Sequence, residues 1–441
     1  MFKNIKYTTV AASLLATQIQ MANAAFVDDQ ANGKGFIADS KLEVKARNYY
    51  FNRNKTHGAV DDKDWTQALL GTYSSGYTQG RVGFGIDAFG YAGFKLDGSD
   101  KYSGSGNLVT DHSGDNEDQH GKAGGALKLR VSKTALKIGT MKPASPVFAV
   151  ADSRLIPQTA TGISLQSSEI KLLDLEAGHF TSGSSQDDTN HDGEMWATYA
   201  GVKADSATFF GGRYEPDEKI DISLYHGRVE NIWDQFYGNV NYLVPLGTGS
   251  SLVFDANYYR TEDSGASKAG TINNNTYALS VGYSFLGAHR LMVAYQKVNG
   301  DTPFDFVGFG DNRRSGGGIF LPNSIQYSDF NGPGESSYQV RYDLNMAPFG
   351  APGLTFVARY VNGKDIDGTR MDPGSPYARF GYGADGKHRE TDVEAKYVVQ
   401  SGPVKNLSVR VRQAWHRANA AQAEGDINDF RIIIEYPISI L

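Results

Sequence analysis

The sequence predicts an all-β protein, a closed antiparallel transmembrane β-barrel of about eighteen strands. Three observations lead to this prediction: apolar and polar residues alternate along the chain, glycine and aromatic residues are abundant, and apolar runs are short. The 441 residues include 51 Gly, 25 Tyr and 23 Phe. Glycine costs about 1 kcal/mol in a helix interior, whereas Tyr and Phe favour strands. No apolar run reaches the ~18 residues that a transmembrane helix needs, so a helical membrane protein is excluded.

The first 24 residues have the features of an export signal. Lys3 and Lys6 supply a positive start, Val10–Ala16 a short apolar segment, and Ala22–Ala24 an A-x-A cleavage site. We therefore expect residues 1–24 to be a signal peptide and residues 25–441 to form a single β-barrel domain.

Alternation is clearest between Arg81 and Leu96. Val82, Phe84 and Ile86 share one parity, while the other holds glycines and polar residues together with Phe89 and Tyr91. Successive strand side chains point to opposite faces, so this segment has one apolar and one mixed face. The same pattern appears near both ends, from Leu42 to Tyr50 and from Phe430 to Ile440. These two segments are the expected first and last strands.

A membrane barrel accounts for the length of the chain. Eighteen strands over the mature chain allow about 23 residues for each strand and its connection, and a membrane strand uses ~9–11. A soluble β-sandwich or propeller would also alternate, but nearly unbroken apolar rows with aromatic residues near their ends favour the membrane. The sheet must close because an open edge in lipid leaves backbone groups unpaired. A barrel of about eighteen strands encloses water, which predicts a channel.

Two segments are expected to be long loops. Met141 to Ser168 contains three prolines, lacks both periodicities and is apolar in its middle. We expect it to fold into the lumen as a constriction loop, and the alternative is a cap on the barrel mouth. Asp97 to Gln119 is rich in Gly, Ser and Asp and is expected to be a solvated external loop.

The sequence does not support an enzyme, a cofactor-binding protein or a nucleic-acid-binding protein. The chain has no Cys, so disulfides, thiolate zinc sites and cysteine nucleophiles are excluded. The nine His are scattered along the sequence, and no GxSxG or HExxH motif occurs. Gly381–Gly386 fits GxGxxG by letter, but no hydrophobic strand precedes it and no helix follows. A net charge of −6 argues against a nucleic-acid partner. We therefore predict no enzyme activity, no cofactor and no metal site.

Several blocks of sequence resemble the OprD-type substrate-specific porins of Gram-negative outer membranes. They cover essentially the whole mature chain: Arg47–Arg53, Gly76–Gly80, Ser153–Gly162, Asp174–Phe180, Gln326–Glu335, Tyr397–Pro403 and Arg412–Arg417. The resemblance implies an 18-stranded barrel among outer-membrane lipids that is a monomer or a loose homotrimer and passes small carboxylate-bearing solutes. The chain ends in Ile440-Leu441 rather than Phe, as members of this family do.

Arginines are expected to line the pore. An arginine fork binds a carboxylate bidentately and keeps its charge, which suits a solute that must exchange its hydration for protein donors. The resemblance implies a basic ladder that passes the carboxylate from one cation to the next. The alternative is that these arginines are neutralised by Asp or Glu across the barrel and only solvate the wall. The candidates, six with inward parity and one on the presumed constriction loop, are Arg47, Arg53, Arg130, Arg154, Arg359, Arg410 and Arg412.

Substrate choice within the family is expected to involve Tyr327 and Asp329. Asp329 would hold an ammonium or guanidinium group while the ladder holds the carboxylate, and the alternative is a loop carboxylate paired with a nearby Arg. Gly316–Gly318 departs from the basic-amino-acid branch, where the resemblance leads us to expect a further acidic residue. We predict passive uptake of small carboxylates, specifically basic amino acids or small peptides. The alternatives are aromatic or other monocarboxylates and, more remotely, an outer-membrane hydrolase or an adhesive barrel.

Overall fold

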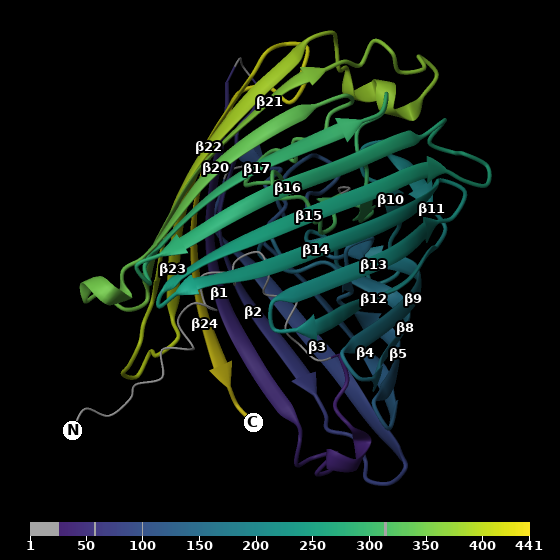
Figure 1. Cartoon of the computed structure of the whole chain (residues 1–441), viewed down its shortest axis with the longest axis vertical. Coiled ribbons are helices and arrows are strands. Elements are labelled where there is room, and N and C mark those ends of the chain that lie inside the picture. Colours follow the sequence, from purple (N-terminus) through teal and green to yellow (C-terminus); the bar gives the residue numbers. More distant parts are fainter. Residues whose placement is uncertain (1–25, 57–58, 99, 313–314) are drawn as a thin grey trace.

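The computed structural model describes residues 26–441 except 57–58, 99 and 313–314, so the expected signal peptide lies outside the described residues. Eighteen strands form one closed antiparallel sheet, which confirms the predicted barrel (Figure 1). They are β1 (Lys41–Lys55), β2 (Asp62–Ser74), β3 (Val82–Asp97), β4 (Gln119–Val131), β5 (Thr134–Met141), β8 (Thr159–Ile170), β9 (Leu173–Ser184), β12 (Ala207–Asp217), β13 (Ile220–Val229), β14 (Trp233–Gly247), β15 (Ser250–Asp263), β16 (Asn273–Phe285), β17 (His289–Asn299), β20 (Ser336–Asn345), β21 (Leu354–Ile366), β22 (Gly386–Val398), β23 (Ser408–Ala418) and β24 (Ile427–Ser439).

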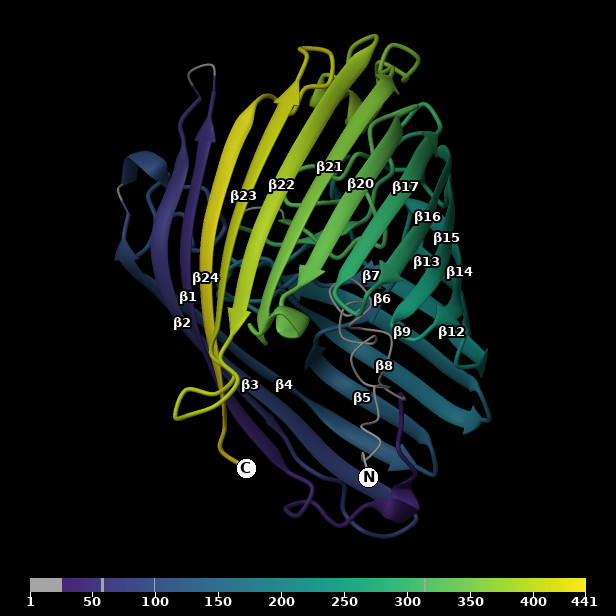
Figure 2. The same cartoon turned by 60° about the vertical axis from the view of Figure 1, so that its left-hand side comes forward.

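The first and last strands close the barrel. β1 pairs with β24 from Glu43↔Ser439 to Lys55↔Ile427, and the yellow β24 lies beside the purple β1 in Figure 2. Each remaining barrel strand pairs with its neighbours in chain order. Closure leaves no sheet edge to lipid, as backbone hydrogen bonding in a membrane requires.

The two ends of the barrel differ in the length of their connections. One end has short turns such as residues 132–133, 171–172 and 248–249, and the other has long loops such as 185–206, 300–335 and 367–385. Within the described residues, no helix is long and apolar enough to cross a membrane. The short elements outside the barrel are η3 (Gln30–Asn32), η4 (Asp100–Tyr102), β6 (Ala144–Ser145), β7 (Phe148–Ala149), β10 (Met195–Ala197), β11 (Val202–Ala204), β18 (Val307–Phe309), β19 (Ser315–Gly316), η5 (Ala347–Phe349) and η6 (Pro376–Phe380).

Alternation assigns the side chains to two faces as expected. On β3, Val82, Phe84 and Ile86 point outward, and Phe84 is 57% exposed on the surface that meets lipid. On β1, Tyr49 and Phe51 point inward and are buried. An apolar outer face is what a membrane barrel requires.

The predicted constriction loop lies inside the barrel, but it is shorter than expected. Strand β5 continues through Met141 and β8 begins at Thr159, so the loop is residues 142–158. The Arg47 side chain on β1 donates to the Arg154 carbonyl oxygen at 2.7 Å, and Tyr259 on β15 donates to the Pro146 carbonyl oxygen at 3.0 Å. Because β1 and β15 lie on different sides of the barrel, the loop crosses the lumen and narrows it.

The glycine-rich segment after β3 is less solvated than expected. Asn107 Nδ2 donates to the Asp64 carboxylate at 2.8 Å, and Ser105 Oγ donates to the same carboxylate. Leu108 is buried with Leu155 and Ile156 of the constriction loop. Part of residues 98–118 therefore folds inward, because these polar groups find partners on the inner face of β2.

Candidate functional site

The lumen below the inward loops is a cavity of about 830 Å³. Its lining includes Lys142, Pro143, Ala144 and Pro146 of the constriction loop, together with Ile319–Pro322 of the long loop 300–335. Charged side chains of both signs face it, among them Arg290, Arg341 and Asp255. The cavity therefore has a mixed wall that carries charges of both signs, and two loop segments contribute to it.

A continuous group of arginines lies on one wall of the barrel, from β20 through β24 to β1. Pairing in register places Arg341 opposite Arg359, and Arg412 opposite Arg431. Directly paired residues share a sheet face, so these side chains lie together on the inner face. We call this surface the arginine wall; its residues are Arg341, Arg359, Arg410, Arg412, Arg431, Arg53 and Arg47.

Most arginines of this wall are bound to buried carboxylates. Arg359 Nε lies 2.8 Å from Asp392, and Asp429 accepts from Arg431 Nε at 2.7 Å and from Arg53 Nε at 2.8 Å. Asp392, Asp429 and Arg431 are almost wholly buried. These pairs hold the wall together, because a buried charge without its partner is strongly destabilising.

Arg410 and Arg412 are less tightly neutralised. They share one carboxylate, Glu394, at 3.5 Å and 3.0 Å. The Arg410 side chain is 31% exposed, against 2% for Arg431. The two charges are therefore only partly compensated by one carboxylate, and Arg410 is the more exposed of the pair, since the Arg412 side chain is 17% exposed.

Arg47 ties the constriction loop to the barrel. It lies 2.7 Å from Asp152 of the loop and 2.8 Å from Glu435 of β24. Desolvation opposes ionisation of Asp152, but the Arg47 guanidinium outweighs it and holds the pKa of that carboxyl below its usual value. Asp152 thus stays ionised, and the Arg47 contact is a stable anchor at neutral pH.

Arg154 lies at the constriction without an ion pair among the described residues. Its Nε donates to the Ser105 carbonyl oxygen at 2.6 Å, and its guanidinium lies 5.3 Å from the centre of the Phe51 ring. Burial lowers its pKa to about 10, so it remains cationic at neutral pH. Its guanidinium thus has neutral partners, the carbonyl oxygens of Ser105 and Ser153.

Arg130 lies apart from the arginine wall. It sits on β4, where its Nε donates to Gln30 Oε1 at 2.9 Å and its guanidinium stacks 4.1 Å from the Tyr77 ring centre. Gln30 belongs to η3, before the first strand, so this arginine packs the start of the described chain against the short-turn end of the barrel.

Tyr327 and Asp329 lie on the long loop 300–335, close to the arginine wall. The Tyr327 ring lies 4.8 Å from the Arg53 guanidinium. Asp329 accepts hydrogen bonds from Tyr199 Oη at 2.9 Å and from Ser324 Oγ at 2.6 Å, with no ion pair in the described residues. Burial raises the pKa of Asp329 to about 6. Its partners are neutral, unlike the Arg that the alternative interpretation required.

The facing wall carries carboxylates held by neutral donors. Asp255 on β15 accepts from the side-chain amides of Asn239, Asn241 and Asn257 at 3.0, 3.2 and 2.6 Å. Glu176 on β9 accepts from Tyr225 Oη at 2.9 Å. Neither carboxylate has an ion pair among the described residues, whereas Arg213 on β12 of the same wall is paired with Glu215 and Asp221. Asp255 and Glu176 are therefore the carboxylates of this wall that remain available to a cation.

Three groups of polar residues were missed at the sequence level. Arg341 and Arg431 belong to the arginine wall, and their inward parity opposite Val340 and Ile432 could have placed them there. Glu176 and Asp255 also have inward parity, but no local pattern separates them from solvating residues. His388 and His416 come together on β22 and β23, although 28 positions separate them in the chain.

Comparison with known proteins agrees with this architecture. Residues 34–440 match the family described as outer membrane porin, OprD family. The chain is 57% identical to Porin D of Pseudomonas aeruginosa over the whole length of both chains.

Solved structures give the same result. The crystal structure of OprD from Pseudomonas aeruginosa is 56% identical, covers 95% of this chain and all of that chain, and has a TM-score of 0.84. The structure of OpdK from the same organism, solved with vanillate, is 33% identical, covers 92% of this chain and all of that chain, and has a TM-score of 0.80.

Proposed function

Because the chain belongs to the OprD family of outer membrane porins, we propose that it admits basic amino acids and small peptides with a free carboxylate by passive diffusion. Membership of this family makes the chain a porin of the Gram-negative outer membrane and not an enzyme. The finer proposal concerns which solutes it favours.

One observation carries the proposal: the lumen has an arginine wall on one side and carboxylates bound to neutral donors on the other. A carboxylate is attracted to the partly compensated Arg410 and Arg412 and to Arg154 at the constriction. An ammonium or guanidinium group is attracted to Asp255 and Glu176. A solute that carries both charges interacts with both walls at once. Because each site binds it weakly and lies near the next one, the solute can continue along the pore.

The arginines differ in their proposed roles. Arg154, Arg410 and Arg412 guide the carboxylate, while Arg53 and Arg359 hold fixed positions beside buried carboxylates and extend the positive field. Arg47 positions the constriction loop through Asp152. A role for Arg130 in the path is not favoured by its contacts with Gln30 and Tyr77.

Tyr327 and Asp329 are proposed to act on substrate choice at the long-loop side of the constriction. Tyr327 stacks on Arg53, which places a phenol ring beside the arginine wall. Asp329 provides a carboxylate whose neutral partners leave its charge uncompensated. Exchange of Asp329 for Asn should therefore reduce uptake of dibasic solutes more than uptake of neutral amino acids.

The experiment compares matched solutes in liposomes that contain the purified porin. L-Arginine carries both charges, agmatine lacks the carboxylate, and benzoate lacks the cation. We expect L-arginine to enter fastest, with agmatine and benzoate slower by roughly tenfold, which corresponds to ~1.4 kcal/mol. Equal rates for L-arginine and agmatine would contradict the proposal.

The second candidate is a porin for aromatic or other monocarboxylates. It is favoured by the likeness to OpdK, whose structure was solved with vanillate. The same assay separates the two candidates, because benzoate would then enter faster than L-arginine.

We also propose that residues 1–24 are removed on export and that the mature chain 25–441 is a monomer or a loose homotrimer. N-terminal sequencing of the protein from outer membranes tests the first point. Light scattering of the detergent-solubilised protein tests the second.

A further inference from the structure

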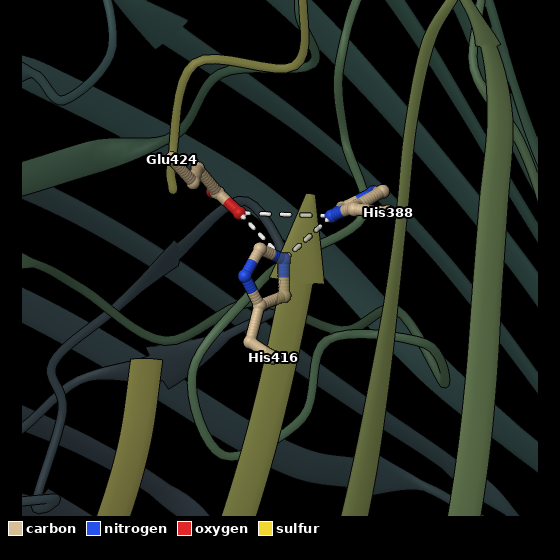
Figure 3. Close-up of side chains that lie close together, drawn as sticks. All are labelled: His388, His416 and Glu424. Atoms are coloured by element: carbon tan, nitrogen blue, oxygen red, sulfur yellow. Dashed lines mark hydrogen bonds and ion pairs between the residues drawn. The ribbon is translucent and has the colours of Figure 1, made fainter. Parts of the chain in front are cut away.

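Two histidines and a glutamate converge near the long-loop end of the barrel wall. His388 comes from β22, His416 from β23 and Glu424 from the loop between β23 and β24 (Figure 3). His388 Nδ1 lies 2.9 Å from His416 Nε2. Glu424 Oε2 lies 3.7 Å from the first nitrogen and 3.5 Å from the second. We call these three residues the His–His–Glu cluster.

The outer nitrogens of both rings are already engaged. His416 Nδ1 lies 2.7 Å from the carbonyl oxygen of Gly425, which can only accept a hydrogen bond, so this nitrogen carries a hydrogen. His388 Nε2 lies 2.6 Å from the Glu335 carboxylate, which makes it the donor there. In the neutral rings, the inner nitrogens His388 Nδ1 and His416 Nε2 therefore both carry lone pairs.

Three electron-pair donors then face one another in a buried position. Glu424 Oε2 is buried and has no hydrogen-bond partner in the described residues. His388 and His416 are almost wholly buried. Lone pairs at such distances repel each other, and buried polar groups without partners are costly. A cation between the three atoms would remove this repulsion and give each lone pair a partner.

We propose that the His–His–Glu cluster binds a divalent transition metal of the zinc class. Zn²⁺ is bound by imidazole nitrogen and carboxylate oxygen at about 2.0–2.2 Å in a tetrahedral geometry, which separates ligand atoms by about 3.3 Å. The separations of 2.9, 3.5 and 3.7 Å bracket this value. Three protein ligands leave a fourth position for water.

The surroundings also fit a metal site. The hydrogen bond from His388 to Glu335 has the carboxylate–histidine arrangement that orients metal-bound imidazoles. Phe330 stacks on His388 with ring centres 4.1 Å apart, and Tyr327 lies 5.0 Å from His416, so aromatic rings flank the cluster. Bound metal would tie the loop carrying Glu424 to β22 and β23, next to Tyr327.

The test measures metal binding to the full-length porin in detergent after treatment with a chelator. We expect one equivalent of Zn²⁺ per chain by competition with a chromophoric chelator. Co²⁺ should give the visible absorption of a low-coordinate Co²⁺ site, and Mg²⁺ should not compete because it prefers oxygen ligands.

Variants assign the site. Glu424→Gln, on a loop, and His416→Gln should each abolish stoichiometric binding and the Co²⁺ spectrum. Glu335→Gln should weaken Zn²⁺ affinity by roughly 10–100-fold through the orienting hydrogen bond. His179→Gln is the matched control, because His179 lies on the opposite side of the barrel, bonded to Thr208. Heat-modifiable migration on gels confirms that each variant is folded.

Two results would overturn the proposal. One is the absence of stoichiometric Zn²⁺ in the wild-type porin, which would mean that the rings share a proton. The other is equal binding by the wild type and by folded Glu424→Gln and His416→Gln variants.

Discussion

The two walls of the lumen differ in the partners of their charged side chains, although Arg213 on the facing wall is also paired with carboxylates. On the wall from β20 to β1, arginines lie beside carboxylates, as Arg431 and Arg53 lie beside Asp429. On the facing wall, Asp255 is held by three asparagine amides and Glu176 by a tyrosine hydroxyl. The number of charged residues on a wall therefore does not show which of them can bind a solute. Charges in buried pairs stabilise the barrel, whereas charges that are partly compensated or held only by neutral donors can still attract a solute.

The largest expected effect follows from breaking a buried pair on the arginine wall. Arg431→Ala leaves the buried Asp429 with Arg53 and the Gln326 amide. An uncompensated buried charge costs about 3–5 kcal/mol, and we expect a loss near the lower end of this range because Arg53 remains. Arg410→Ala should cost about 1 kcal/mol or less, because its side chain is partly exposed. Urea unfolding of the two variants in detergent checks this ranking, and equal losses would contradict it.

The next effect concerns the partly compensated pair. Arg410→Glu combined with Arg412→Glu places new negative charge beside Glu394 and should lower carboxylate flux tenfold or more, since ~1–4 kcal/mol is plausible at close range. Ion selectivity should move toward cations, and the effect should weaken at ~1 M salt. Reversal potentials in planar bilayers measure the change in selectivity and its dependence on salt.

Two controls sharpen this prediction. Arg81→Glu makes the same kind of charge change in an exposed turn and should leave selectivity unchanged. Val411→Glu lies between the two arginines with opposite parity, paired with Ile432, and should impair assembly rather than selectivity. Unchanged selectivity in the double variant would mean that the arginines only solvate the wall.

A smaller effect is expected on the facing wall. Asp255→Asn removes one negative charge and nearly keeps the shape, although its NH2 group can no longer accept from one of the asparagine amides. Cation permeability should fall roughly fivefold, or ~1 kcal/mol. Glu218→Gln, in an exposed turn, is the control with the same charge change. If Asp255→Asn and Glu218→Gln have equal reversal potentials, Asp255 does not contribute to the lumen field.

The smallest effect is a pH dependence in the long loop 300–335. Asp305 of this loop accepts from the backbone of Tyr199, Ala200 and Phe306, and burial raises its pKa to about 6. Because the pKa of this carboxyl is higher in the folded than in the unfolded protein, protonation stabilises the folded loop. This stabilisation is complete below the unfolded pKa near 4 and is lost as pH rises through about 6. The loop should therefore exchange amide hydrogens faster at about pH 7.5 than at about pH 5, after correction for intrinsic exchange.

Asp305→Asn tests the origin of this change, because an amide cannot ionise. The variant should lose the contribution of Asp305 to the pH dependence. Unchanged pH dependence in Asp305→Asn would assign the effect to other groups, such as Asp329, whose pKa burial also raises to about 6.

The sequence by itself determined the barrel, its closure and the face on which each strand residue lies. These are local properties: a strand has a period of two, so Val82, Phe84 and Ile86 share a face whatever surrounds them. The same rule gave inward parity to Arg47, Arg359, Arg410 and Arg412. It also located the first and last strands, because β1 and β24 lie where the first and last alternating segments were expected.

Only the tertiary structure decided which charges meet. Arg47 binds Asp152 across 105 positions of chain, and the path of the constriction loop, not its composition, brings them together. Arg130 has the same parity as the other candidates, yet the position of β4 in the barrel separates it from the arginine wall. His388, His416 and Glu335 come from different strands and a loop. Strand register and loop paths depend on contacts between distant segments, so no local periodicity could have placed these groups together.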